Sequence, residues 1–448
     1  MHFKFWDIAY GNPVEELRPG NPHKRIQSQL CTFAIVVKNM KTFEVPSIYR
    51  SPLISAIKNY RKQQDKLKKD FTPTLLDLGS LHIYLARHFG FCYGVENAIE
   101  IAFRTVEENP GKRIFLLSEM IHNPQVNAGL QEKGVQFLQD TLGHQLIPFE
   151  TITKDDVVII PAFGTTLKME AKLKGMGIQT EKYNTTCPFV EKVWNRSEQI
   201  AGKGYTVVIH GKPRHEETRA TFSHAAANAP SVIVNDMKDS IELANYITGQ
   251  KPPEQFYTDF KGLFSEGFDV TRDLQRIGVV NQTTQLASDT QAIADYLKQT
   301  IQRHFGLPDN RIGERFADTR DTLCYATNDN QTAVTGMLST PADLAIIIGG
   351  YNSSNTTHLV ELCEEKLPSY FINGEDKIIS GNDILHYNFH RKQELITTSY
   401  LPDSNPVKIL ITSGASCPDA LVEAVIRKLG SFYNAEDQID NLIQQFTE

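Results

Sequence analysis

Short apolar runs along the chain end abruptly in small polar residues, and a helical pattern follows each of them. Six runs stand out: RIFLLSEMIHN, DVVIIPAFGTT, YTVVIHGKPRHEET, RIGVVNQTT, LAIIIGGYNSSN and VKILITSGASCPD. Near-continuous Val, Ile and Leu are typical of strands buried on both faces. Helical patterns such as QAIADYLKQTI and ALVEAVIRKL alternate with them. The chain is therefore predicted to form βαβ units with mostly parallel sheets, an α/β fold.

The polar residues that follow these runs are expected at the carboxyl edge of a sheet. Open α/β sheets bind ligands at that edge, next to helix N-termini. Any one such residue could be only a helix N-cap or a turn former. Together, with no acidic cluster among them, they predict a shared anion site, because backbone N–H groups at helix starts favour phosphate. The residues are His122, His215, Thr283, Ser353, Ser354, Asn355 and Ser416.

Three of the six cysteines share one setting. Cys92, Cys187 and Cys324 each follow a loop and precede a helical pattern. A helix N-terminus stabilises thiolate, so a lowered thiol pKa is expected at all three. The chain between them is long enough for whole α/β lobes, and three lobes could bring three thiolates around one point. Such a set would hold an iron–sulfur cubane with one open iron, or a zinc ion with one open position.

Buried structural cysteines are the plainer alternative, because free cysteine is among the most buried residue types. The chain has no C-x-x-C pair and too few cysteines for a disulfide scaffold. Cys31 and Cys363 are expected to be structural. Cys417, which follows Ser416, is the remaining rival ligand.

The charge balance narrows the class of protein. The formal net charge of −7 over 448 residues argues against a general nucleic-acid or membrane-surface binder, but it is compatible with a local basic pocket for an anionic small molecule. No apolar run reaches the roughly 20 residues that cross a bilayer. The N-terminus also lacks an apolar signal region. We therefore expect a cytoplasmic protein with no membrane or nucleic-acid partner.

Eight motifs occur in the order, and at roughly the spacing, of one known family: GFCYGV, EMIHN, TTCPFV, GKPRHEET, NQTT, LCYATNDNQ, GGYNSSNTTHL and TSGASCPD. Over about residues 82–430 the chain resembles the LytB-type 4-hydroxy-3-methylbut-2-enyl diphosphate reductases, in particular their long cyanobacterial and plastid-type branch. The resemblance implies three similar α/β lobes with mostly parallel sheets, arranged as a trefoil around a central [4Fe–4S] cluster in which one iron has no cysteine ligand.

The resemblance also implies how the chain divides. We expect an N-terminal extension, three lobes that carry Cys92, Cys187 and Cys324 in turn, and a C-terminal helix, with the bounds 1–80, 81–185, 186–322, 323–430 and 431–448. An irregular, partly helical insertion is expected in the second lobe, near 237–275. The basic stretch SAIKNYRKQQDKLKKD in the extension is typical of a solvated helix face, with a docking arm as the alternative.

Residue roles follow from the same resemblance. The cluster ligands of the family match Cys92, Cys187 and Cys324. Its proton-relay acid matches Glu217, and the threonine of its Q-T-T motif matches Thr283. Its diphosphate-binding residues match His122, His215, Ser353, Ser354, Asn355 and Ser416.

Two departures from the family pattern bear on the site. Phe163 stands where compact bacterial members carry a histidine, which puts a third pocket histidine in doubt. His215-Glu216-Glu217 replaces the family's H-P-E. Whether Glu216 or Glu217 faces the pocket is therefore open, and the motif spacing favours Glu217.

The implied reaction is a two-electron, two-proton reductive dehydroxylation of the allylic diphosphate to isopentenyl and dimethylallyl diphosphate, the last step of the methylerythritol phosphate route to isoprenoids. No flavin or dinucleotide fingerprint is evident, so an external one-electron donor such as a ferredoxin or flavodoxin is expected. Two other classes stay open. One is a phosphate-ester hydrolase or transferase that uses the Ser, Thr and His loops, and the other is a non-catalytic iron–sulfur sensor.

Overall fold

The structure is a computed structural model that describes residues 43–317 and 322–447. Residues Glu44–Glu448 form one compact unit, which contains all of the features described below. Cys31 and most of the predicted N-terminal extension lie outside the described residues. None of the helices in the described ranges is long and apolar enough to cross a membrane.

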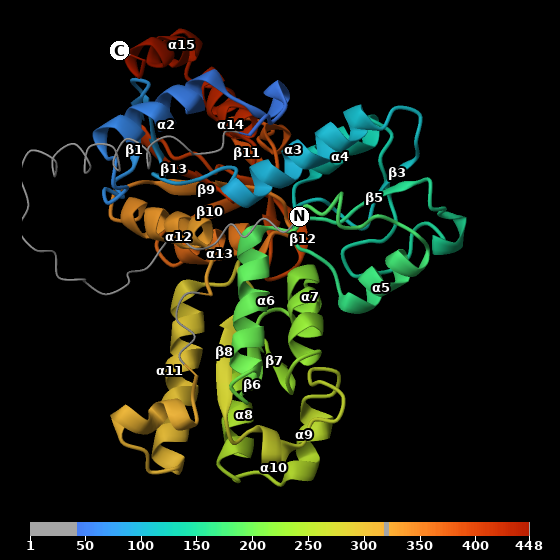
Figure 1. Cartoon of the computed structure of the whole chain (residues 1–448). Coiled ribbons are helices and arrows are strands. Elements are labelled where there is room, and N and C mark those ends of the chain that lie inside the picture. The colour runs from blue at the N-terminus through green and yellow to red at the C-terminus, as the bar shows by residue number, and fades with distance from the viewer. Residues whose placement is uncertain (1–42, 318–321, 448) are drawn as a thin grey trace, which may run out of the picture. The chain divides into compact units, whose positions relative to one another are not determined.

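A five-stranded sheet forms the core of the lobe that contains Cys324 (Figure 1). β1 and β2 pair in antiparallel fashion, and the other neighbours are parallel. The strands stand in the order β1-β2-β13-β9-β10, with the bounds β1 (Thr74–Asp77), β2 (Leu81–Leu85), β9 (Leu344–Ile348), β10 (Ser369–Ile372) and β13 (Val407–Ser413). Helices cover this sheet: α2 (Pro52–Gln64), α12 (Tyr325–Met337), α13 (Ser354–Glu364), α14 (Asp419–Ser431) and α15 (Glu436–Gln445).

This sheet corrects the predicted boundary at residue 81. β2 pairs with β13, with Ile83 opposite Ile409, so residues 81–85 belong to the sheet of the Cys324 lobe and not to the lobe of Cys92. β1 and α2 also join this lobe, although the sequence placed them in the extension. The physical reason is apolar burial, since Leu76 and Ile57 lie in the same hydrophobic core as β9 and β13.

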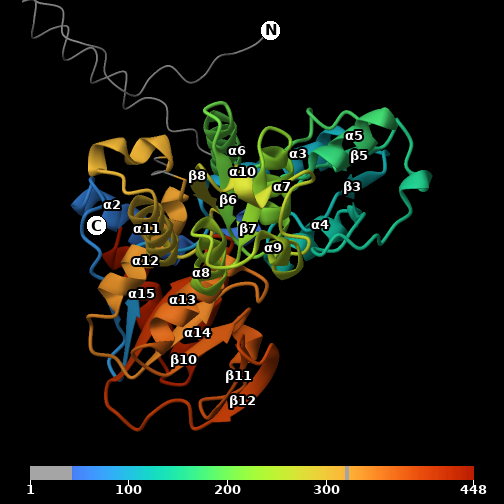
Figure 2. The same ribbon diagram turned by 90° about the horizontal axis from the view of Figure 1, so that it is seen from below.

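An antiparallel hairpin stands beside the five-stranded sheet, next to β10 (Figure 2). It consists of β11 (Asp383–Asn388) and β12 (Gln393–Thr398). The sequence analysis did not anticipate it. Its strands, DILHYN and QELITT, mix polar and apolar residues and are partly exposed, so they lack the continuous apolar run that identified the parallel strands.

The first lobe has a short parallel sheet in the order β4-β3-β5. Its strands and helices are β3 (Ile114–Leu116), β4 (Gln136–Phe137), β5 (Val157–Ile159), α3 (Tyr93–Glu108), α4 (Pro124–Glu132) and α5 (Leu167–Gly175). All residues of β3 and β5 are buried. This confirms the prediction from RIFLL and DVVII.

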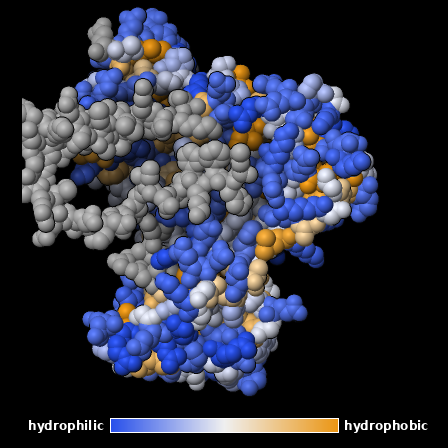
Figure 3. Space-filling model, in the orientation of Figure 1, coloured by the Kyte–Doolittle hydropathy of each residue, from blue (hydrophilic) through white to orange (hydrophobic). Residues whose placement is uncertain are grey.

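The second lobe has a parallel sheet in the order β7-β6-β8. Its elements are β6 (Thr206–His210), β7 (Ser231–Val234), β8 (Ile277–Asn281), α6 (Pro188–Ala201), α7 (Glu216–Ala226), α8 (Met237–Ile247), α9 (Pro253–Asp259), α10 (Val270–Asp273) and α11 (Ala287–His304). The predicted insertion contains α8 to α10. Its side chains Leu243 and Phe256 share a buried cluster with Val279 of β8, so the insertion is integral to the lobe. The face drawn in Figure 3 shows largely hydrophilic residues over this lobe.

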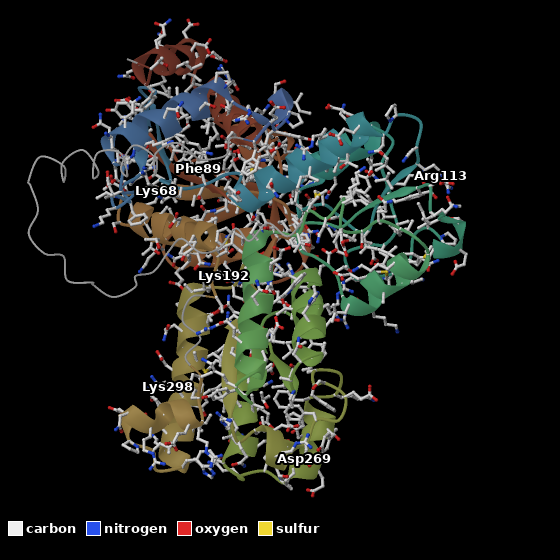
Figure 4. The ribbon with its side chains drawn as sticks, in the orientation of Figure 1. Lys68, Phe89, Arg113, Lys192, Asp269 and Lys298 are labelled. Carbon is white, nitrogen blue, oxygen red and sulfur yellow. The ribbon has the colours of Figure 1, made fainter. Side chains whose placement is uncertain are left out.

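One end of the second lobe joins the rest of the unit, and the other end points away from it. Figure 4 labels Lys192 near the start of α6, where the lobe joins the rest of the unit, and Asp269 at the opposite end. Cys187 immediately precedes α6 and therefore lies at the junction of the lobes.

Candidate active site

Each of the three singled-out cysteines is the N-cap of a helix. Cys92 precedes α3, Cys187 precedes α6 and Cys324 precedes α12, and none of the three side chains makes a cap hydrogen bond. At the start of α4, by contrast, the Asn123 side chain accepts from the Val126 N–H as N-caps commonly do. The cysteine positions thus give up a usual capping interaction, and their sulfur atoms remain available.

The thiols of two lobes meet at Gly94. A Cβ at this glycine would stand 2.3 Å from Sγ of Cys187, so the sulfur of the second lobe lies against the first turn of α3. A thiolate charge on Cys92 raises the pKa of Cys187, and a thiolate charge on Cys324 raises the pKa of both. The three thiols are therefore neighbours, one from each lobe.

The prediction of lowered thiol pKa values is wrong for the metal-free protein. Burial, together with the neighbouring thiols, raises the pKa of Cys92 to about 12 and that of Cys187 well above its ordinary value. Burial also raises the pKa of Cys324. Backbone N–H groups at the helix starts lower these values but do not outweigh desolvation. Cys324 is buried, Cys92 and Cys187 are partly buried, and at all three positions desolvation favours the protonated thiol over the thiolate.

One cavity brings the predicted site residues together. It is lined by the three cysteines and also by His122, His215, Glu217, Thr283, Ser353, Ser354, Asn355 and Ser416. The non-cysteine residues lie in the loops or first helical turns that follow five different strands, β3, β6, β8, β9 and β13, as the edge-of-sheet argument requires. Cys417 is fully buried but does not line this cavity, and Cys363 lies in the core of the Cys324 lobe.

Glu217 faces the cavity with both carboxyl oxygens held. The backbone N–H of Thr283 donates to Oε1, and the Thr283 hydroxyl donates to Oε2 at 3.0 Å. Only 1% of Glu217 is exposed. Burial raises the pKa of this carboxyl to about 7, although the Thr283 hydrogen bonds pull it down. Glu217 is therefore an acid poised to give up a proton near neutral pH.

Glu216 points elsewhere. Its carboxyl accepts a hydrogen bond from the Ser118 hydroxyl of the first lobe, and it does not line the cavity of the cysteines. Burial raises its pKa to about 7 as well. Since α7 begins at Glu216, the two acids occupy successive helical positions and project in different directions. The geometry agrees with the motif spacing that favoured Glu217.

His122 and His215 form a pair inside the cavity. His215 Nδ1 accepts from the Glu217 N–H at 3.2 Å, which assigns its proton to Nε2, and this atom lies 3.2 Å from His122 Nε2. His122 Nε2 is then the acceptor, so its own proton is on Nδ1, 3.6 Å from Glu119 Oε2. Burial and the nearby cations lower the pKa of His215 well below its ordinary value. His215 is consequently neutral in the ligand-free protein.

Phe163 fixes the orientation of this pair. Its ring stacks on His122 with centroids 4.3 Å apart and meets His215 edge-on at 5.5 Å. The cavity therefore has an aromatic wall at the position where the sequence comparison found a histidine missing.

The loop before α13 supplies hydroxyl and amide groups. Ser353 caps the helix by accepting from the Thr356 N–H at 3.3 Å. Asn355 accepts from the Ala415 N–H at 2.8 Å, and its Nδ2 is buried with no partner in the described part of the chain. Ser416 donates to the His122 carbonyl at 3.3 Å. A buried amide donor without a partner, next to serine hydroxyls, is suited to an anionic ligand.

Gln282 is a supporting residue that the sequence analysis did not single out. Its Oε1 accepts from the Lys212 N–H at 3.1 Å and from the Thr218 hydroxyl at 3.0 Å. It thereby ties the loop before α7 and the first turn of that helix, which carry His215 and Glu217, to the loop that carries Thr283. Gln282 belongs to the NQTT motif, but an amide side chain at a strand end has no acid–base or metal-binding chemistry that would have identified it as a site residue.

The arrangement of possible metal ligands distinguishes a single metal ion from a cluster. Across residues 43–317 and 322–447, no group of three or more His, Cys, Asp or Glu side chains is arranged to hold a metal ion. A zinc ion needs ligands that converge on one point. In a cubane each thiolate binds a different iron, so three neighbouring sulfurs can hold one without meeting at a single point.

Comparison with known proteins agrees with the motifs. The LytB protein family model matches residues 83–430. A 4-hydroxy-3-methylbut-2-enyl diphosphate reductase of Cyanothece sp. is 42% identical over 353 residues, which make up 78% of this chain and 84% of that protein. A protein of the same name from Synechococcus sp. is 39% identical over 386 residues, 86% of this chain and 90% of its own.

A solved structure supports the fold. The E-1-hydroxy-2-methyl-but-2-enyl-4-diphosphate reductase from Plasmodium falciparum has a TM-score of 0.55 and 21% sequence identity, and the match covers 77% of this chain and 86% of that one. At this identity the likeness concerns the arrangement of helices and strands alone.

Proposed function

The chain belongs to the LytB family and is an iron–sulfur oxidoreductase that acts on 4-hydroxy-3-methylbut-2-enyl diphosphate, and we propose that the cavity of the three cysteines is its active site. The reaction adds two electrons and two protons to the allylic alcohol. The C–O bond breaks, water leaves, and isopentenyl or dimethylallyl diphosphate remains. The described side chains then have three tasks: to hold the cluster, to bind the diphosphate and to supply a proton.

Cys92, Cys187 and Cys324 are the proposed ligands of a [4Fe–4S] cluster in which one iron has no cysteine ligand. The missing Cβ at Gly94 leaves room for Cys187 Sγ, and the uncapped helix starts direct backbone N–H groups toward the sulfurs. Iron would replace the three thiol protons. When bound, such a cluster supplies electrons, and its open iron is a Lewis acid for the departing hydroxyl group.

The diphosphate would lie among His122, His215 and the loops of Ser353 and Ser416. Asn355 Nδ2 gives the strongest support, since it is a buried donor with no partner in the described residues. The His215 Nε2–H, the serine hydroxyls and the start of α13 add further donors around the same cavity. Hydrogen bonds from these donors to a dianionic or trianionic diphosphate would be charge-assisted and therefore stronger than bonds to a neutral ligand.

Glu217 is the proposed proton donor to the leaving hydroxyl. Hydroxide is a poor leaving group, so the reaction needs an acid beside the C–O bond. With a pKa of about 7, Glu217 keeps a useful fraction of its proton at neutral pH. Thr283 orients the carboxyl through its N–H and hydroxyl group.

Electrons have to arrive from outside the chain, and we propose a ferredoxin- or flavodoxin-type protein as the one-electron donor. The cytoplasmic location expected from the sequence remains part of this proposal.

One observation carries the assignment: sulfurs from three lobes, a buried acid and an unpartnered amide donor line a single cavity. The test is anaerobic purification followed by Mössbauer and EPR spectroscopy with and without the hydroxylated diphosphate. We expect a brown protein whose signal from one iron site changes on addition of substrate. A colourless, air-stable protein would favour a hydrolase or transferase, and a coloured protein indifferent to the diphosphate would favour a sensor.

A further inference from the structure

A second cavity, of about 370 Å³, adjoins the active-site cavity. His122, His215 and Ser354 line both cavities, so the two histidines stand between them. The outer cavity is bounded by the loop before α7 and by the β11–β12 hairpin. The GKPRHEET motif, so far used only for its histidine and acids, contributes two cations to it.

The outer cavity has an excess of positive charge. Lys212, Arg214 and Lys392 line it. Lys212 Nζ makes no ion pair within 4.0 Å to any described carboxylate, and Glu361, whose charge acts on it, is held by His358 Nδ1 at 2.5 Å. Burial and the charge of Lys392 lower the pKa of Lys212. Like charges that line one cavity without a paired carboxylate repel each other, and a bound anion would offset this repulsion.

The acidic groups nearby do not neutralise these cations. Glu216 lines the cavity, but its carboxyl is engaged by Ser118 and burial raises its pKa to about 7. Glu394 of the hairpin is bound by Lys377 Nζ at 2.8 Å and by the Tyr351 hydroxyl at 2.9 Å. The cation excess of the cavity is therefore available to a ligand.

Tyr351, in the loop after β9, and Tyr387, in β11, give the outer cavity an aromatic wall. The Tyr351 and Tyr387 rings stack with centroids 4.4 Å apart and planes 10° from parallel. Lys392 lies in the turn of the hairpin, where its backbone φ is 55°. The wall presents apolar surface beside the cations, as a short isoprenoid carrying a diphosphate requires.

We propose that the outer cavity is a capture site, in which Lys212, Arg214 and Lys392 bind the diphosphate of the incoming substrate before it passes to His122 and His215. The role as an entry site rests on the proposed function, whereas the affinity for a diphosphate does not. The net charge of the whole chain is −7, so a trianionic substrate is repelled at long range. A local cation cluster at the mouth of the site would offset this repulsion and raise the association rate.

Two measurements on the anaerobic holoenzyme test the proposal. Calorimetry measures the binding of inorganic pyrophosphate, and stopped-flow absorbance measures the association rate of the hydroxylated diphosphate. Lys212→Gln is expected to weaken pyrophosphate binding and to slow association by about tenfold. Lys392→Gln, a change at an exposed turn, is expected to do so by about threefold, with a shallower salt dependence.

Arg391→Gln is the matched control. It removes the same charge from the same turn, but Arg391 is exposed and does not line the cavity, so pyrophosphate binding and association are expected to stay at wild-type values. The proposal is overturned if Lys212→Gln and Lys392→Gln bind pyrophosphate as the wild type does, or if Arg391→Gln weakens it equally. A wild-type protein that fails to reduce the hydroxylated diphosphate overturns the proposed function instead, and the pyrophosphate titration still decides whether the cavity binds anions.

Discussion

Thr283 holds both oxygens of the Glu217 carboxyl, one through its backbone N–H and the other through its hydroxyl at 3.0 Å. The contact joins the first turn of α7 to the loop after β8, and the buried acid lines the cavity of the three cysteines. The strength of this contact helps to set the pKa of Glu217, because burial raises that pKa and the Thr283 hydrogen bonds lower it.

The pH dependence of turnover should report Glu217. Its pKa is raised from the ordinary carboxyl value to about 7, so the proton-donating form persists up to neutral pH and is lost above it. With a chemical reductant and saturating substrate, turnover should fall by about tenfold per pH unit on the alkaline side. Glu217→Gln should reduce turnover by about 10²- to 10⁴-fold and remove this limb. Glu216→Gln should retain it; if the limb disappears with Glu216 instead, the acid has been misassigned.

Removal of the Thr283 hydroxyl should shift the alkaline limb of the pH profile of turnover. Thr283→Val deletes a hydrogen bond that lowers the Glu217 pKa and keeps the backbone N–H donor. The alkaline limb should therefore move to higher pH, and turnover should fall by about tenfold because the carboxyl is less well oriented. Thr283→Ser keeps the hydroxyl and should restore both properties. An unshifted profile in the valine variant would show that the hydroxyl does not act on Glu217.

Cluster assembly should depend on the absent side chain at Gly94. A Cβ at this position would stand 2.3 Å from Cys187 Sγ, so Gly94→Ala should displace the sulfur and lower the iron content per chain. Iron analysis and visible absorption after anaerobic reconstitution measure the loss. Gly175→Ala is the control, since nothing lies within 4 Å of its Cβ position and Gly175 ends α5. Full iron content in the Gly94 variant would place the cluster elsewhere.

Replacement by serine should remove the cluster at Cys187 but not at Cys363. Cys187→Ser should abolish the brown colour and reductase activity, because a hydroxyl is a poor iron ligand at neutral pH. Cys363→Ser places the same hydroxyl in a fully buried position, in the core of the Cys324 lobe, and should keep the colour at a cost of about 1–3 kcal/mol in stability. Iron content, thermal unfolding and turnover separate the two outcomes. A colourless Cys363 variant that unfolds like the wild type would contradict the assignment.

The parallel strands and the edge position of the site could be predicted from the sequence because both follow from local patterns. Six apolar runs predicted strands at positions where β3, β5, β6, β8, β9 and β13 lie. The polar residues after them then had to gather at strand ends, as His122 and Thr283 do. The roles of these residues still rest on the family resemblance and on the experiments above.

Other features depend on long-range packing. The partner of β2 is β13, which no local pattern near residue 81 reveals. The thiol pKa values were predicted in the wrong direction because the helix start was visible in the sequence and the depth of burial was not. The direction of Glu216 depends on Ser118 of another lobe. The outer cavity requires the β11–β12 hairpin, whose half-exposed strands carry no strong pattern.

The pairing of β2 with β13 has a consequence for synthesis on the ribosome. The second lobe, with Cys187, has its complete sheet once residue 281 has emerged, whereas the five-stranded sheet lacks its central strand until residue 413 follows. The loop of Cys92 is anchored to this late strand, because the Cys92 N–H donates to the Ala415 carbonyl. The loop of Cys92 therefore reaches its final position only after residues 407–415 have been synthesised, long after the loop of Cys187.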